Sequence, residues 1–158
     1  MIRKLSPEDA PAIYDVINQA AKAYHGIIPD DRYHEPYMPG EELRHEMKNM
    51  AFFGWEEEDK LVGVMGFQPV AEVTLIRHAY VLPDYQKKGI GARLLNHLMQ
   101  MTESRQLLVG TWADATWAID FYRKHGFKFM PDKGGLLRQY WDIPQRQVET
   151  SVVLGIEM

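Results

Sequence analysis

The chain of 158 residues contains no cysteine at all. A disulfide, a thiolate-bound metal and a thiol nucleophile are therefore all excluded. If the protein transfers a chemical group, the transfer cannot pass through an intermediate bound to cysteine.

Long apolar runs are also missing, since no stretch approaches the ~18 residues that are needed to cross a bilayer. We therefore expect no membrane partner. The opening residues Met1 to Asp9 lack the apolar segment and small-residue cleavage site of a secretory signal. We expect a cytoplasmic protein.

Positive charge is not concentrated anywhere in the chain. The net charge is -4 and no basic stripe is visible, which argues against a nucleic-acid partner. None of the six histidines stands in a His-x-His or His-x-x-x-His pair, so the sequence predicts no metal site.

What the sequence does contain is typical of a globular domain. Its hydrophobic fraction is 46% and its charged fraction is 25%. No repeat, linker or low-complexity tract divides it, so we expect one domain over residues 1–158.

Hydrophobic periodicity and turn residues predict a mixed α/β domain. The first helix is expected to start at Ser6 and Pro7, and the helix at 116–125 is expected to be capped by Gly126. Loops are expected at 25–40 and 132–135, and a hairpin turn at 57–60. Strands are predicted at 2–5, 51–56, 61–67, 71–82, 107–111, 127–130 and 148–156, with helices at 6–24, 41–50, 92–104 and 116–125.

The most informative stretch joins the strand ending at Leu82 to the following helix. Gly89 and Gly91 permit a tight turn and a close approach of a ligand to the backbone. The first helical turn offers free N–H groups and a positive dipole end, and Lys87 and Lys88 add charge. The stretch indicates a site for phosphate or pyrophosphate, although an ordinary glycine turn explains it equally well by itself.

A second stretch gives the first its context. The chain reads Gln86-x-x-Gly89-x-Gly91-Ala92 and later Ala118-x-x-Phe121-Tyr122-x-x-x-Gly126-Phe127. In order, spacing and surrounding elements, the two segments resemble the motifs of the GCN5-related N-acetyltransferase (GNAT) superfamily. The resemblance covers essentially the whole chain.

The resemblance implies a fold and a ligand. The fold is a strongly twisted mixed sheet flanked by helices, in which the parallel strands at 71–82 and 107–111 splay apart to admit acetyl-CoA. The backbone near Tyr80 and Val81 would pair with the pantetheine arm like an added strand. For Phe121, core packing is as good an explanation as cofactor contact, and Trp117 is expected in the core. The implied cofactor-binding residues are Tyr80, Val81, Gln86, Lys87, Lys88, Gly89, Ile90, Gly91, Ala92, Ala118, Phe121 and Tyr122.

The implied reaction is attack of a neutral amine on the thioester. The Val81 N–H is our hypothesis for the donor to the oxyanion. Tyr122 occupies the position of the family's general-acid tyrosine, which would protonate the CoA thiolate. A buried tyrosine without a catalytic role is the alternative.

The motif does not identify the general base that would accept the proton of the amine, because Leu75 stands where many relatives carry a glutamate. Glu72 or His78 on the same strand are the candidate bases, with His25 and His34 as further possibilities. Strand alternation puts His78 on the face of Tyr80 unless a bulge intervenes. A second departure is Ala115, where many relatives have an asparagine.

The leading hypothesis is an acetyl-CoA-dependent N-acetyltransferase that acts directly on a small-molecule, amino-acid or peptide amine. The alternatives are a non-catalytic acyl-CoA-binding sensor and a transferase of a larger acyl group, for which Arg77 is the candidate contact. The loop at 25–40 is either a lid or a surface connection. Its acidic residues either steer a cationic amine or form a solvated surface. The resemblance also implies a homodimer, with Trp141 and the strand at 148–156 as the edge.

Overall fold

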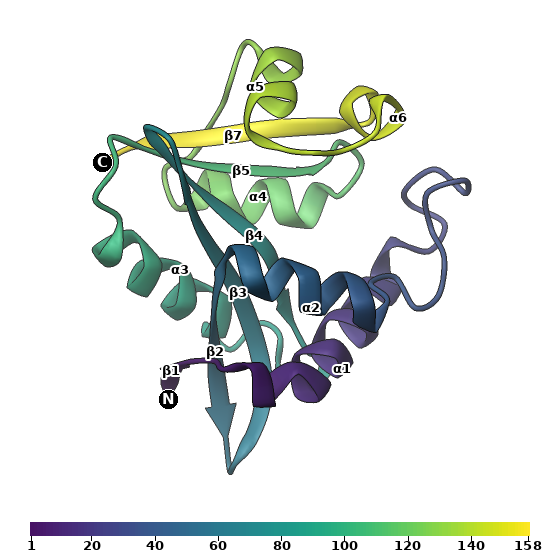
Figure 1. The fold of residues 1–158 in the computed structure, drawn as a ribbon, viewed down its shortest axis with the longest axis vertical. Coiled ribbons are helices and arrows are strands. Elements are labelled where there is room, and N and C mark those ends of the chain that lie inside the picture. Colours follow the sequence, from purple (N-terminus) through teal and green to yellow (C-terminus); the bar gives the residue numbers. More distant parts are fainter.

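The computed structural model describes all residues 1–158, which form one seven-stranded mixed sheet with helices on both faces (Figure 1). The strands are β1 (Ile2–Lys4), β2 (Ala51–Glu57), β3 (Lys60–Val70), β4 (Val73–Val81), β5 (Gln106–Trp112), β6 (Lys128–Phe129) and β7 (Ser151–Glu157). The helices are α1 (Ala10–Ala20), α2 (Gly40–Asn49), α3 (Ile90–Met101), α4 (Thr116–Lys124), α5 (Lys133–Tyr140) and α6 (Gln145–Glu149), with short 3₁₀ turns at Pro7–Asp9, Ala21–Tyr24 and Pro83–Tyr85.

The strand order is β1-β2-β3-β4-β5-β7-β6, and every neighbouring pair is antiparallel except β4 and β5. The predicted hairpin between β2 and β3 is present, with Glu58 and Asp59 at positive φ (50° and 64°). Two consecutive residues at positive φ are typical of a two-residue hairpin turn, because the twist of that turn matches the twist of the strands it joins. The predicted mixed α/β class is confirmed. No helix in the chain has both the length and the apolar character required of a membrane span.

The two parallel strands pair over only part of their length. Val73–Ile76 of β4 pairs with Gln106–Val109 of β5, and beyond these residues the strands diverge (Figure 1). The register between β3 and β4 shifts between Val64 and Gly66, opposite His78, whose φ is +53°. A bulge adds twist and bends a strand, and here it lies where β4 leaves β5. The expected splay of these two strands is therefore present.

The helices cover opposite faces of the sheet. Phe53 of β2 packs on His97 of α3 at 5.5 Å between ring centres, whereas its neighbour Phe52 stacks on His78 at 6.0 Å. His78 in turn contacts Glu46 of α2. Because successive strand residues point to opposite faces, α3 lies on one face and α2 on the other.

The first helix begins as predicted, but through a 3₁₀ turn. The Asp9 carboxylate accepts the backbone N–H of Ser6 at 2.8 Å and also receives the guanidinium of Arg3 at 2.7 Å. Arg3 reaches Glu56 of β2 as well. This ion cluster joins the edge strand β1 to the first turn and to its neighbouring strand.

Two predictions for the C-terminal third were wrong. The segment 132–135 is not a loop, because Asp132 caps α5 by accepting the N–H of Gly135 at 3.2 Å. The buried Leu137 then holds the glycine-containing helix against the sheet. Val148 lies in α6, so the last strand starts at Ser151.

The expected edge at 148–156 was also wrong. Strand β7 lies between β5 and β6, since Leu154 and Gly155 pair with Phe129 and Lys128. The outermost strands of the sheet are β1 and β6. Helices α5 and α6 lie beside β7 (Figure 1).

Candidate active site

The glycine turn has the geometry of an anion site. Gly89 precedes α3 with a φ of +81°, and Lys87 also has a positive φ of 63°. The first hydrogen bond of α3 runs from the Arg93 N–H to the Gly89 carbonyl at 3.0 Å. The amides of Ile90, Gly91 and Ala92 therefore have no partner within the helix and remain available to a ligand.

Both the backbone N–H and the side chain of Gln86 have partners within the turn. Its backbone N–H donates to the Pro83 carbonyl at 3.3 Å, so it is already engaged. Its side chain donates to the Val81 carbonyl at 3.0 Å, which holds the turn against the end of β4. Lys87 and Lys88 are exposed, and the Lys88 ammonium lies 5.3 Å from the centre of the Tyr85 ring.

The backbone of Val81 faces the gap between β4 and β5. The neighbouring Leu82 N–H donates to Val62 of β3 at 2.8 Å. In an antiparallel pair, successive residues direct their backbone groups to alternate sides. The Val81 N–H consequently points away from β3, which is the direction that the oxyanion hypothesis requires.

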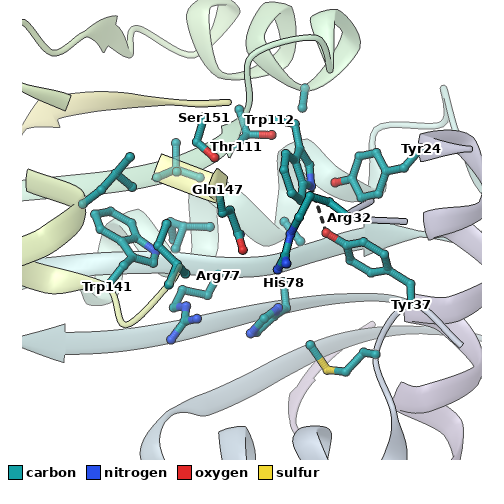
Figure 2. Close-up of a pocket in the computed structure, with 18 of the residues that line it drawn as sticks. Tyr24, Arg32, Tyr37, Arg77, His78, Thr111, Trp112, Trp141, Gln147 and Ser151 are labelled. Atoms are coloured by element: carbon teal, nitrogen blue, oxygen red, sulfur yellow. Dashed lines mark hydrogen bonds between the residues drawn. The ribbon is translucent and has the colours of Figure 1, made fainter. Parts of the chain in front are cut away.

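A pocket of about 290 Å³ lies where β4 and β5 diverge (Figure 2). Its walls come from both strands, from α2 and α4, from the 24–38 segment and from the chain around α5 and α6. Aromatic rings dominate one side, where the Trp112 Nε1–H donates to the Tyr37 hydroxyl at 2.9 Å. Its ionisable lining residues include Arg32, Glu42, Glu46, His78, Tyr122 and Asp142.

The α4 motif residues border this pocket. Tyr122 and Ala118 line it directly. Burial raises the pKa of the Tyr122 hydroxyl well above its ordinary value, and the nearby Tyr24 phenol raises it further. Tyr122 therefore stays protonated through the neutral range, as a general acid must.

Phe121 lies between the core and the glycine turn. It is half-buried, and its ring would sit 3.4 Å from a β-carbon placed on Gly91. Trp117 is a correction to the sequence prediction, because its side chain is 45% exposed. It stacks on Tyr24 at 5.9 Å instead of entering the core.

The bulge in β4 brings two consecutive side chains to one carboxylate. Arg77 Nη2 and His78 Nε2 lie 3.2 Å and 3.1 Å from the same Glu46 oxygen. Consecutive strand residues ordinarily point to opposite faces, and the positive φ of His78 removes that alternation. Tyr80 also lies on this face, since its ring packs on Tyr24 at 6.2 Å.

The environment keeps His78 neutral. Burial lowers the pKa of the His78 imidazole, and the charge of Arg77 lowers it further, while Glu46 opposes both effects in part. Burial would raise the pKa of the Glu46 carboxyl, but the hydrogen bond from His78 and the charge of Arg77 offset it, so that the net shift is downward. Glu46 is thus a carboxylate that orients a neutral imidazole.

The other candidate bases lie elsewhere or are exposed. Glu72 lies at the turn before β4, outside the pocket, and accepts a hydrogen bond from Tyr140. His25 is exposed and stacks on Tyr33, while His34 lines the pocket but is also exposed. Leu75 and Ala115, the two departures from the family pattern, are fully buried.

Comparison with known proteins shows the family of the chain. Residues 12–127 match the family model described as the acetyltransferase (GNAT) family. The chain belongs to this family. This is the family that the two sequence motifs implied.

Two curated relatives are similar to this GNAT chain. The UPF0157 protein YqkA of Bacillus subtilis is 30% identical over 103 residues, which cover 62% of this chain and 30% of YqkA. The chain thus spans less than a third of YqkA. A spermidine N(1)-acetyltransferase of Thermoplasma acidophilum is 24% identical, with 80% of this chain and 87% of that protein covered.

Solved GNAT structures share the fold. The PaiA N-acetyltransferase of Thermoplasma acidophilum, in complex with coenzyme A, superposes with a TM-score of 0.76. Its sequence is 22% identical, and the match covers 100% of this chain and 98% of that one. The similarity confirms the predicted GNAT fold.

Proposed function

We propose that the protein is an acetyl-CoA-dependent N-acetyltransferase that transfers the acetyl group directly to a primary amine of a small molecule, an amino acid or a peptide. One observation carries the proposal. A single pocket between the diverging strands is lined by a tyrosine, Tyr122, and by a histidine, His78, that the Glu46 carboxylate orients. These are the acid and the base that amine acetylation requires.

The chain has groups that fit acetyl-CoA. The free amides of Ile90, Gly91 and Ala92, with Lys87 and Lys88 beside them, suit the pyrophosphate. The outward-facing backbone of Val81 suits an extended pantetheine arm. Ala118 and Phe121 border the same route on the α4 side.

Each residue then has one chemical task. His78, oriented by Glu46, accepts the proton of the attacking amine, directly or through water. The Val81 N–H stabilises the negative charge on the former carbonyl oxygen. Tyr122 delivers a proton to the sulfur of the departing CoA. No cysteine is available for a covalent intermediate, which is in keeping with direct transfer.

A polyamine is a second candidate acceptor. It is favoured by the spermidine N(1)-acetyltransferase relative and by two exposed carboxylates that line the pocket, Glu42 and Asp142. Carboxylates at a pocket mouth attract a cationic amine.

The test is to incubate the purified protein with acetyl-CoA and a pool of amines, amino acids and peptides, following CoA release and product mass. We expect a new acetylated product. The Tyr122→Phe variant should bind acetyl-CoA with unchanged affinity and turn over about 100-fold more slowly, because it lacks only the acid. Tight binding of acetyl-CoA without any product would instead favour a non-catalytic binding module. Equal turnover of both proteins at all pH values would remove Tyr122 from the mechanism.

A further inference from the structure

The pocket contains a cation that the proposed reaction does not use. Arg32 comes from the segment before α2 and extends its side chain into the pocket toward the strand that carries His78 (Figure 2). Its residue is only partly exposed, and its Nε is buried without a hydrogen-bond partner. It is the one buried side-chain nitrogen or oxygen in the chain that lacks a partner.

The other charges of the pocket do not neutralise Arg32. Arg77, the second arginine in the lining, is already paired with Glu46 at 3.2 Å. None of the five ion pairs in the molecule includes Arg32. Burying a donor of a charged group without an acceptor is costly. A bound ligand that supplies an acceptor would therefore gain from this arrangement.

A carboxylate is an acceptor that suits a guanidinium well. The two groups form paired, charge-assisted hydrogen bonds whose planar geometry also fixes orientation. Glu42 and Asp142, both exposed, lie in the same lining and leave room for a positive group. The lining thus offers one free cation and two exposed anions, a pattern that matches a zwitterion.

We infer that the acceptor is an amino acid, whose carboxylate binds to Arg32 while its amine faces His78. The inference rests on the proposed function and narrows it to one substrate class. A polyamine fits less well, because it brings a second positive charge to an arginine that is already unpaired. The aromatic wall formed by Tyr37 and Trp112 suits an amino acid with an apolar side chain.

The kinetic test compares amino acids with amines that lack only the carboxylate. Phenylalanine is set against phenethylamine and methionine against 3-(methylthio)propylamine, with spermidine as the polyamine. We expect kcat/KM to be about 100-fold higher for each amino acid than for its partner. Arg32→Met should remove that preference, chiefly through KM for the amino acid, and Arg32→Lys should restore part of it. Arg138→Met is the control, since Arg138 is exposed on α5 and does not line the pocket.

A binding test needs no turnover. Calorimetry in the presence of CoA compares N-acetylphenylalanine with N-phenethylacetamide, which lacks the carboxylate. A carboxylate preference that Arg32→Met abolishes supports the binding of a carboxylate by Arg32, and it would do so even if the protein acetylated nothing, so that failure of the proposed function is distinguishable from failure of this site. The inference would be overturned if wild type bound both compounds equally or preferred spermidine. It would also be overturned if Arg32→Met lost the same affinity for the compound with the carboxylate as for the compound without it. Unchanged thermal unfolding and acetyl-CoA affinity of Arg32→Met establish that the variant is folded.

Discussion

At the scale of single residues, the central feature is a histidine whose basicity is set by its surroundings. Desolvation alone would leave His78 a weak base. Glu46 restores part of that basicity and accepts the Nε2–H, so Nδ1 is the nitrogen left to receive a proton. Arg77 contacts the same Glu46 oxygen, and its positive charge limits how far the pKa of His78 can rise.

Removing the base should change the pH profile as well as the rate. Because the pKa of His78 is lowered, kcat should show an acidic limb whose inflection lies below the ordinary histidine pKa of about 6.5. We expect His78→Ala to lose about 100-fold or more and to abolish this acidic limb. Glu46→Gln should move the limb to lower pH, since Glu46 raises the pKa of His78.

The control for both variants is His45→Ala, an exposed histidine next to Glu46 on α2. It should keep the wild-type profile in steady-state kinetics between pH 5 and 9. A His78→Ala protein with full activity through neutral pH would exclude His78 as the base.

At the scale of elements, the turn before α3 depends on one glycine conformation. Gly89 has a φ of +81°, and a β-carbon placed there would meet no atom within 4 Å. The need for glycine is therefore a matter of backbone strain and of leaving the approach to the helix amides open.

Gly26 provides a matched comparison for Gly89. It has the same φ of +81° and equally open surroundings, but it lies in the segment after Tyr24. Gly89→Ala and Gly26→Ala should each cost about 1 kcal/mol in the free energy of unfolding. Only Gly89→Ala should raise the KM for acetyl-CoA. Similar KM values for the two variants would show that the turn does not bind the cofactor.

At the scale of the whole molecule, the sheet consists of two halves that separate beyond four paired positions of β4 and β5. The outer edge of the larger half is the three-residue strand β1. Arg3, Asp9 and Glu56 hold that edge through ion pairs, so its attachment depends on the charge of the carboxylates. A homodimer stays a prediction, and one that continued the sheet would pair at β1 or β6.

Acid should weaken the whole chain through Asp9. Hydrogen bonds from Arg3 lower the pKa of Asp9 to about 2 from 3.8. A lowered folded-state pKa contributes stability above the unfolded value and loses it as the pH falls toward 2. Because Arg3 is 40% exposed, we expect Asp9→Asn to cost only about 1 to 2 kcal/mol at pH 7. Urea unfolding at pH 7, 4 and 2.5 should show that the difference in the free energy of unfolding between Asp9→Asn and wild type decreases as the pH falls. The exposed Asp120→Asn should show no such trend.

Much of the fold was predictable because its signals are local. The Ser6-Pro7 helix start, the two-residue turn at Glu58 and Asp59 and the amphipathic helices each depend on neighbours a few residues apart. Helix α5 was missed because Gly134 and Gly135 read as a loop. The cap by Asp132 and the burial of Leu137 outweigh their poor helix propensity.

The sequence by itself determined the family, the glycine turn and the position of Tyr122, because these follow from short motifs at fixed spacing. Only the tertiary structure decided what surrounds them. Glu46 and His78 are 32 residues apart, and a bulge puts Arg77 and His78 on one carboxylate. Arg32 becomes a candidate binding residue only in the fold, which buries its Nε without a partner in a pocket made from distant elements. Burial and long-range contacts, which determine pKa values and unpaired charges, are not written in any local pattern of residues.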